Sequence, residues 1–403
     1  MKHLFVTQYF HPEVFRGNDI AYDWVMRGDS VTVVTAIPNY PKGSFTKGYG
    51  IFSKRKEILN GVTVIRVPVI PRGNGSGLQL VLNYFSYTLM GSIYCFFLAL
   101  FNKYDTIFVQ QLSPVTMAIP GVVAKKVNRK PLSIWVLDLW PESLASAGNI
   151  KNKHVMRFFE LIVKKIYKHS DRIFYSSKGF KASISEKGDF SHKISYLPNW
   201  AEKVFTKSEK IVVIPQLPEG FIVLFAGNVG EAQDFENIMN AALQLKEDKK
   251  IKFVIVGDGR KKHWVDNFVK QNSLEETVSC LGRYPLEAMP SFFEKADVML
   301  VSLKDEPIFN LTLPAKTQAY MMSGKPIVGM MSGEGQYVIN EAECGLCVNA
   351  GDYKALSEKI QFLSAMKKHE LDVFGENGKR FATTNFNKSV LLNQLYSEIQ
   401  SIS

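Results

Sequence analysis

Short apolar runs alternate with longer mixed segments along the first half of the chain. The runs are rich in β-branched and aromatic residues, which favour strands. They are Leu4–Val6, Val31–Val34, Val62–Val69, Thr106–Val109, Ser133–Leu137 and Arg172–Tyr175. The segments between them are long enough for helices. Strands that are apolar throughout and alternate with helices predict a parallel sheet covered on both faces.

The same alternation starts again after Trp200. Its apolar runs are Phe221–Gly227, Lys252–Gly257, Val298–Ser302, Pro326–Gly329 and Gly345–Val348. We therefore predict two Rossmann-like α/β domains with parallel sheets, residues 1–200 and 201–385, with a cleft between them. Residues 386–403 have helical apolar spacing, and we expect this last helix to cross back to the N-terminal domain.

One segment breaks this pattern, because residues 73–102 contain no Asp, Glu, Lys or Arg over 30 residues. Its central part is long enough to cross a bilayer, which takes roughly 20 apolar residues. However, polar residues such as Asn83 and Ser92 interrupt it, and it lies between two predicted strands of one sheet. A single span would separate those strands. We therefore favour a helix over residues 78–101 that is buried or lies at an interface, with a transmembrane span as the alternative.

Composition narrows the class of protein further. With 46% hydrophobic and 22% charged residues in a chain of 403, disorder is excluded. Four cysteines at dispersed positions form no disulfide framework, which favours a reducing compartment. The apolar run before Pro12 is too short for a signal peptide. We therefore expect a cytoplasmic protein.

Charge is divided unequally between the two halves. Residues 1–200 hold 26 Lys and Arg against 12 Asp and Glu, whereas the remainder holds 23 against 26. A basic domain suits an anionic membrane, a phosphorylated substrate or nucleic acid. No zinc-finger spacing, RNP-like stretch or Arg-rich tail supports nucleic acid, so none is expected as a partner.

Three glycine-containing turns follow predicted strands in the second half, at Gly227–Gly230, Gly257–Gly259 and Gly282–Pro285. Glycines at such places let the backbone approach a phosphate, and a following helix start supplies N–H groups. Arg283 and Tyr284 would offer a nucleobase a charged group and an aromatic face. Each turn is equally compatible with ordinary loop geometry.

Charged side chains gather in two further loops. The loop between Lys304 and Lys316 carries Asp305 and Glu306 ahead of a predicted helix. Carboxylates accept hydrogen bonds from sugar hydroxyls and a lysine at a helix start can hold a phosphate, although an exposed charged loop is the alternative. Asp138 follows a predicted strand, where α/β proteins place their chemistry, but an Asp there also caps helices.

The residues required for several other kinds of site are missing from the sequence. There is no Asp-x-Asp triplet for a metal–diphosphate bridge and no Gly-x-Ser-x-Gly nucleophile elbow. Cys344 and Cys347 have no second pair, so packing is the better interpretation than zinc. No metal and no cofactor are expected.

Together these motifs resemble bacterial glycosyltransferases of family 4, which have the two-domain GT-B fold. The resemblance covers essentially the whole chain, and the closest subgroup resembles transferases of O-antigen and capsule synthesis that use UDP-N-acetyl-L-fucosamine. The motifs that carry it are Gln8–Glu13, Pro38–Pro41, Asp138–Glu142, Leu197–Trp200, Ala226–Asn228, Gly257–Gly259 and Gly324–Pro326.

The resemblance implies a nucleotide-sugar donor on the C-terminal domain, an acceptor on the N-terminal domain, and transfer that retains anomeric configuration without a metal. Catalytic roles are expected for Asp138 and Lys316. The expected donor-binding residues are Gly227, Asn228, Gly257, Arg283, Tyr284, Glu306, Lys316, Gln318 and Glu334. The expected acceptor-binding residues are His11, Glu13, Arg16, Asn39, Tyr40 and Trp140.

The chain departs from the family in its donor site. The usual Arg and Lys after the first glycine turn are Asn228 and Gln233, and the usual Glu-x7-Glu pair is Leu311 and Ala319. The subgroup has Pro-x-Lys instead, present as Pro314–Lys316. We infer that Lys316 takes over neutralisation of the diphosphate.

The sequence therefore predicts a retaining glycosyltransferase of O-antigen, lipopolysaccharide or capsule synthesis, peripheral on the inner face of the bacterial plasma membrane. Its partners would be a UDP-sugar, an undecaprenyl-diphosphate-linked acceptor and the anionic membrane surface. A UDP-sugar 2-epimerase of the same fold and a non-catalytic membrane-docking protein are the alternatives.

Overall fold

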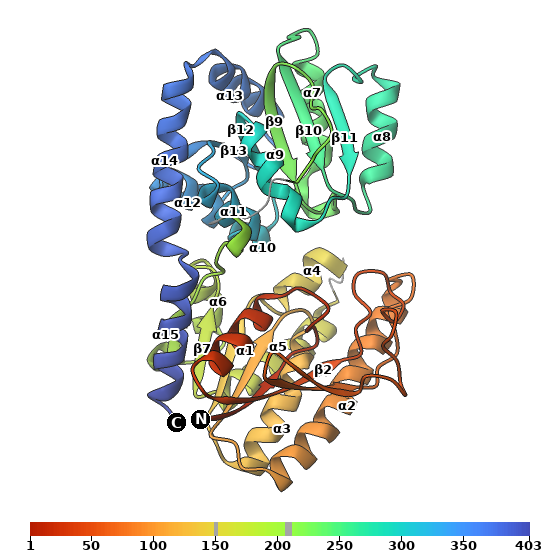
Figure 1. Ribbon diagram of the computed structural model, residues 1–403, viewed down its shortest axis with the longest axis vertical. Coiled ribbons are helices and arrows are strands. Elements are labelled where there is room, and N and C mark those ends of the chain that lie inside the picture. The colour runs from red at the N-terminus through yellow and green to blue at the C-terminus, as the bar shows by residue number, and fades with distance from the viewer. Residues whose placement is uncertain (149–151, 206–211) are drawn as a thin grey trace. The chain divides into compact units, whose positions relative to one another are not determined.

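The computed structural model describes residues 1–148, 152–205 and 212–403, which form two compact units (Figure 1). The first unit comprises residues 1–198 and 389–403, and the second comprises residues 199–388. The chain thus passes from the first unit to the second after Pro198 and returns to the first unit after Lys388.

The first unit is built on an eight-stranded sheet with the order β3-β4-β2-β1-β5-β6-β7-β8. Its strands are β1 (Lys2–Val6), β2 (Ser30–Ala36), β3 (Lys56–Leu59), β4 (Val62–Val67), β5 (Thr106–Gln111), β6 (Leu132–Val136), β7 (Arg172–Tyr175) and β8 (Ile194–Tyr196). All pairs are parallel except β3 with β4, a hairpin at the edge.

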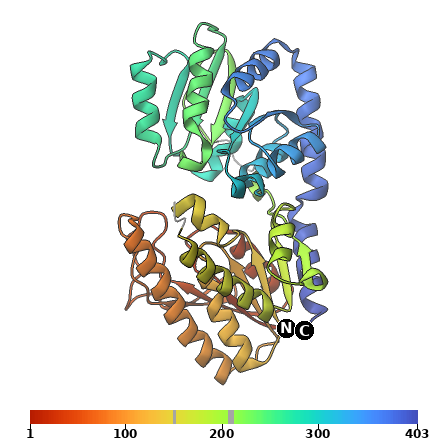
Figure 2. The same cartoon turned by 180° about the vertical axis from the view of Figure 1, so that it is seen from behind.

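Helices cover both faces of this sheet. Figure 2 shows α2 (Gly77–Phe101), α3 (Ile119–Asn128) and α5 (Lys153–His169) over one face, whereas α1 (Arg16–Met26) lies over the other in Figure 1. The shorter helices are α4 (Glu142–Gly148) and α6 (Phe180–Glu186). The last helix, α15 (Lys388–Gln400), packs against this unit: Ser195 Oγ donates to Glu398 at 2.7 Å, and Tyr396 donates to Asp29 at 2.8 Å.

The uncharged segment forms α2, which is long and apolar enough to cross a membrane. Only a narrow stripe of α2 is buried, at Asn83, Tyr87, Gly91, Cys95 and Ala99, where α3 and the sheet pack against it. Ten of its large apolar side chains are exposed. A fully buried helix is therefore excluded, and both neighbouring strands, β4 and β5, lie in one sheet.

The second unit contains a six-stranded, fully parallel sheet with the order β11-β10-β9-β12-β13-β14. Its strands are β9 (Phe221–Ala226), β10 (Ile251–Val256), β11 (Val278–Gly282), β12 (Val298–Ser302), β13 (Ile327–Met330) and β14 (Gly345–Val348). Its helices are α7 (Phe235–Gln244), α8 (Lys262–Gln271), α9 (Met289–Lys295), α10 (Pro307–Asn310), α11 (Ala315–Met322), α12 (Glu334–Glu341), α13 (Tyr353–Ala365) and α14 (Lys368–Asn385). They bury two apolar clusters against the sheet.

Both sheets reverse their strand order beside their first strand, between β1 and β5 in one unit and between β9 and β12 in the other. In open parallel sheets, ligands bind outside the carboxyl ends of strands at such a reversal. The prediction of two Rossmann-like domains with parallel sheets is confirmed, and the carboxyl edge of each sheet is where a site is expected. The edge strands β3 and β8 were not predicted.

Candidate functional site

Two glycine turns meet at the carboxyl edge of the second unit. Gly227 follows β9 and Gly257 follows β10, and a Cβ added to Gly257 would lie 1.8 Å from the Gly227 carbonyl oxygen. A Cβ on Gly259 would lie 2.3 Å from the Val229 carbonyl oxygen. Only glycines allow the two backbones to pack this closely. The edge next to Asn228 is therefore lined by backbone rather than by bulky side chains, as a phosphate site requires.

Lys316 is directed at this glycine edge from the first turn of α11. Its Nζ is buried 3.7 Å from the centroid of the Phe225 ring, and a Cβ on Gly227 would lie 3.3 Å from it. Among the described residues, no hydrogen-bond partner reaches this Nζ. Burial lowers the pKa of Lys316 to about 7. Its charge is thus poorly solvated until an anion reaches it.

Tyr320 holds α11 in place one turn after Lys316. Its hydroxyl donates to the Ala226 carbonyl at 3.0 Å and accepts from the Ala226 N–H at 2.9 Å. Side chains four residues apart lie on the same face of a helix, so this pair of bonds fixes the direction of Lys316. No sequence motif marks Tyr320, because its role depends on a contact with a strand 94 residues away.

The other predicted donor residues are distributed along the same edge. Arg283 is exposed and Tyr284 half-buried directly after β11, Glu306 caps α10 after β12, and Glu334 begins α12 after β13. The structure thus brings Gly227, Asn228, Gly257, Lys316 and these four residues to one edge of one sheet. Gln318 is different, since it is fully buried. With its nitrogen facing them, its amide donates to the carbonyls of Pro314 and Ala315 at 3.0 and 2.8 Å.

In the first unit, Asp138 and Trp140 lie at the carboxyl edge after β6, and both meet Ser113, which follows β5. Trp140 Nε1 donates to Ser113 Oγ at 3.0 Å, and the Ser113 hydroxyl and N–H bond to the Asp138 carboxylate. Burial raises the pKa of Asp138, against the opposing effect of the Ser113 bonds. A half-desolvated carboxylate with an elevated pKa is suited to accepting a proton. The sequence analysis missed Ser113.

The carboxylate of Glu13 already has hydrogen-bond partners within the protein, unlike a side chain that is free to bind an acceptor. Its Oε1 accepts from the backbone N–H groups of Asn39 and Tyr40, at 2.9 and 2.7 Å, and its side chain is 7% exposed. Burial raises its pKa to about 7. Glu13 therefore holds the loop after β2 against the loop after β1, and so positions the exposed ring of Tyr40.

The remaining predicted acceptor residues lie around these two loops. The His11 carbonyl accepts from Arg66 Nη2 at 2.8 Å, and the Asn39 side chain donates to the Ile37 carbonyl at 2.7 Å. Arg16 is half-buried at the first position of α1. The structure places all of these residues at the carboxyl edge of the first sheet, beside β1 and β2.

Arg72 is a residue of this edge that the sequence analysis missed. It lies between β4 and α2, donates from Nη1 to the Tyr9 hydroxyl at 2.6 Å, and stacks over the rings of Tyr40 and Tyr84. Phe15 stacks on Tyr9 at 5.1 Å. The result is an aromatic platform with one guanidinium. Because Tyr84 belongs to α2, the platform is continuous with that helix.

The chemistry available differs between the two edges. The second unit offers backbone N–H groups and a buried cation, which suit a diphosphate. The first unit offers aromatic faces and a buried carboxylate, which suit a sugar and a hydroxyl to be deprotonated. Within the described residues, no group of three or more His, Cys, Asp or Glu side chains is arranged to hold a metal ion.

The chain is similar to several known proteins. Residues 207–381 match the family model described as "Glycosyl transferases group 1". The probable glycosyltransferase WbjE of Pseudomonas aeruginosa is 32% identical over 240 residues, which cover 56% of this chain and 58% of WbjE. The putative colanic acid biosynthesis glycosyl transferase WcaI of Escherichia coli K12 is 23% identical over 396 residues, 94% of each chain.

A solved structure matches the fold over the full length. Anabaena Alr3699/HepE, in complex with UDP and glucose, superposes with a TM-score of 0.69 at 14% identity and covers 100% of both chains. At this identity the likeness shows the fold. The family model and both relatives are named for glycosyl transfer.

Proposed function

We propose that the chain is a GT-B glycosyltransferase that transfers a sugar from a UDP-sugar to a lipid-linked saccharide in the synthesis of a surface polysaccharide. The observation that carries the proposal is that the buried Nζ of Lys316, beside the Gly227 turn, has no hydrogen-bond partner among the described residues. A cation held in this state is stabilised by a diphosphate, on which negative charge grows as the sugar leaves. HepE, with the same fold, was solved with UDP.

The donor is assigned to the second unit. In this proposal the diphosphate contacts Lys316 and the N–H groups near Gly227, Asn228 and Gly257. Arg283 and Tyr284 face the base, and Glu306 and Glu334 accept from ribose or sugar hydroxyls. No metal is required, because Lys316 and the backbone supply the positive potential. The subgroup resemblance favours UDP-N-acetyl-L-fucosamine as the donor.

The acceptor is assigned to the first unit. Asp138 orients or deprotonates the attacking hydroxyl, and Ser113 holds its carboxylate. The platform of Tyr9, Tyr40 and Arg72 contacts the acceptor sugar. The family resemblance supports transfer with retention of anomeric configuration, which is the outcome we propose.

The lipid on the acceptor is inferred from α2 and from charge. A sugar on undecaprenyl diphosphate lies at the level of the lipid headgroups, so the acceptor unit has to approach the bilayer. The exposed apolar face of α2 and the basic balance of residues 1–200 suit peripheral attachment to the anionic inner face of the plasma membrane. WcaI is named for colanic acid biosynthesis, which is a surface polysaccharide role of the same kind.

The test is UDP release from a panel of UDP-sugars, with and without an undecaprenyl-diphosphate-linked saccharide. A glycosyltransferase releases UDP in step with acceptor consumption, and the anomeric proton of the product reports retention. Conversion of the donor sugar without UDP release would instead identify an epimerase. Membrane binding without turnover of any donor would identify a docking protein.

A further inference from the structure

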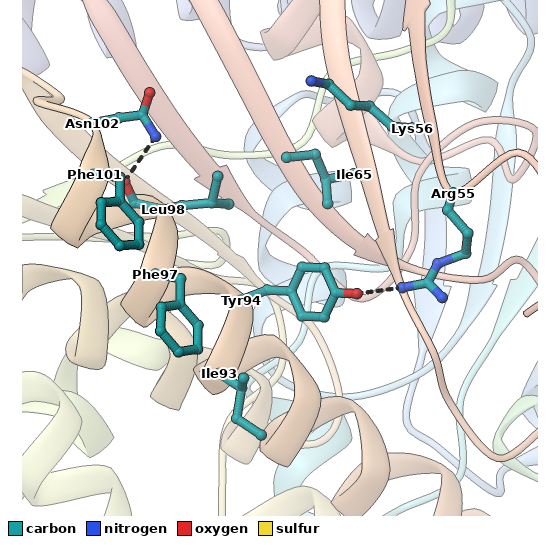
Figure 3. A pocket seen from close by; sticks show the side chains of 9 residues that line it. All are labelled: Arg55, Lys56, Ile65, Ile93, Tyr94, Phe97, Leu98, Phe101 and Asn102. Atoms are coloured by element: carbon teal, nitrogen blue, oxygen red, sulfur yellow. Dashed lines mark hydrogen bonds between the residues drawn. The ribbon is translucent and has the colours of Figure 1, made fainter.

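A groove opens on the outer side of the first unit, between the C-terminal half of α2 and the β3–β4 hairpin (Figure 3). Its volume is about 650 Å³. One wall consists of Ile93, Tyr94, Phe97, Leu98 and Phe101 of α2, and Ile65 of β4 lies opposite. The groove is therefore almost wholly apolar, although it opens to the surface.

Two cations stand at the rim of this groove. Arg55 precedes β3 and Lys56 begins it, directly across from Ile65 in the hairpin register. Arg55 Nη2 donates to the Tyr94 hydroxyl at 2.8 Å, and its Nε and Nη1 donate to the carbonyls of Arg66 and Ile51, which fixes the guanidinium beside the apolar wall. In the described part of the chain, neither cation forms an ion pair, whereas the neighbouring Glu57 is paired with Arg66. Neither charge is thus neutralised by a carboxylate, and Lys56 is the more exposed of the two.

The surroundings extend this combination of apolar and basic groups. Phe52, next to the two cations in sequence, is fully exposed, and Ile58 is 72% exposed. On the other side the groove continues into the exposed face of α2, where Phe85 and Leu89 also face solvent. An apolar slot with cations at its opening and apolar neighbours on both sides matches one chemistry, that of a lipid chain with an anionic headgroup.

We propose that this groove binds one anionic phospholipid of the bilayer, with an acyl chain against Phe97 and Ile65 and its phosphate at Arg55 and Lys56. This inference rests on the membrane association within the proposed function, and it adds a specific lipid site. The acceptor lipid does not fit as the occupant. Tyr84, on the acceptor platform, and Tyr94, the partner of Arg55, are 10 residues apart on α2, which corresponds to about 15 Å along the helix. A diphosphate at Arg55 would therefore lie about 15 Å along α2 from the platform that is proposed to hold its sugar.

The test is calorimetric titration of the full chain with dioctanoyl phosphatidylglycerol, kept below its micelle concentration. We expect saturable binding of one lipid, about thirtyfold tighter than dioctanoyl phosphatidylcholine, since the two basic side chains contribute about 1 kcal/mol each. Lys56→Gln, on an exposed side chain, should reduce this preference about fivefold, and Ile93→Ser should weaken both lipids. Phe85→Ser, on the exposed face outside the groove, is the matched control and should change neither.

Three results would overturn the proposal: no saturable binding, equal losses in Ile93→Ser and Phe85→Ser, or tighter binding of farnesyl diphosphate in competition with phosphatidylglycerol. The last result would assign the groove to an isoprenoid acceptor. Acceptor-dependent UDP release measured on the same samples separates the two proposals. If UDP release persists without lipid binding, only the lipid site fails. If lipid binds and no donor turns over, only the transferase proposal fails.

Discussion

The carboxyl edges of the two sheets share a topology and differ in every chemical respect. In the second unit the turns after β9 and β10 pack against each other through Gly227 and Gly257. The buried Nζ of Lys316 lies beside them and has no hydrogen-bond partner among the described residues. In the first unit the corresponding loops carry aromatic rings and a carboxylate, Asp138, that is hydrogen-bonded by Ser113. The same strand order therefore supports two kinds of site.

The difference also concerns the charge of the buried groups that lack a hydrogen-bond partner among the described residues. At the edge of the first unit the charged groups Glu13 and Arg72 each bond to neighbouring loops. The buried side-chain oxygens of Gln8 and Gln111 lack a partner there, but they are neutral. In the second unit such an atom is the Nζ of Lys316, whose burial costs stability when no anion is bound. This contrast supports the proposal that the second unit binds an anion and the first unit a neutral sugar.

Asp138→Asn should have the largest effect. The amide cannot accept the proton, and loss of a general base lowers turnover by roughly 10²–10⁴-fold. Steady-state kinetics with saturating donor and acceptor would measure this change in kcat. Asp189→Asn, at an exposed Asp of the same unit, is the control and should be unaffected. A kcat within a factor of about three of wild type would remove Asp138 from catalysis.

Lys316→Ala should reduce kcat/KM for the donor by an amount worth about 2–4 kcal/mol, the scale of one electrostatic donor to a developing charge. Lys316→Arg should recover part of this loss, because it keeps the charge. Lys359→Ala removes an exposed lysine of α13 in the same unit and should leave activity intact. Near-normal activity in Lys316→Ala would show that the backbone alone neutralises the diphosphate.

The same lysine should limit stability. Burial holds the pKa of Lys316 near 7 in the folded state, below its unfolded value, so folding expels a proton between about pH 7 and the unfolded pKa. The destabilisation is therefore complete below pH 7 and is relieved as the pH rises. Lys316→Met should raise the free energy of unfolding by roughly 2–3 kcal/mol at pH 6. Urea unfolding at pH 6 and pH 9.5 should show this gain shrinking at the higher pH. An equal gain at both would mean that the charge is not its cause.

The smallest expected effect concerns α5, which supplies basic groups to the membrane-facing unit. Lys165→Gln with Lys168→Gln should weaken binding to phosphatidylglycerol vesicles by about thirtyfold, at roughly 1 kcal/mol per exposed lysine, and the loss should vanish in high salt. Lys354→Gln with Lys359→Gln, two exposed lysines of the second unit, is the matched control. Equal losses in the two double variants would contradict a membrane role specific to the first unit.

The sequence predicts those parts of the structure that depend on local pattern. Strands β1 and β9 contain the continuous apolar runs Leu4–Val6 and Phe221–Ala226, and the residues that follow each strand lie at the carboxyl edge of its own parallel sheet. The edge strands β3 and β8 were missed because they are short and half-exposed, with charged or polar residues such as Lys56 and Ser195. The sequence shows that α2 is uncharged. It does not show which face of α2 is exposed, because that depends on how the helix packs against α3 and the sheet.

The contacts of the candidate site depend on distances in space, which the pattern does not encode. Lys316 was expected at the diphosphate, but its burial against Phe225 and its support by Tyr320 arise from tertiary packing. The acceptor role expected for Glu13 stays a prediction, and the structure shows that its carboxylate accepts from the backbone of the next loop. Arg72 and Ser113 stand in loops without a motif, so no sequence signal marked them.

The assignment of donor and acceptor to different units is tested most directly by the affinity for UDP alone. Calorimetric titration of UDP into wild type, Lys316→Ala and Asp138→Asn compares one residue from each edge with the same ligand. The account predicts that Lys316→Ala weakens UDP binding by about tenfold or more, since one charge-assisted contact is worth about 1.5–3 kcal/mol, and that Asp138→Asn binds UDP as wild type does. Unchanged affinity in Lys316→Ala together with a loss in Asp138→Asn would contradict it.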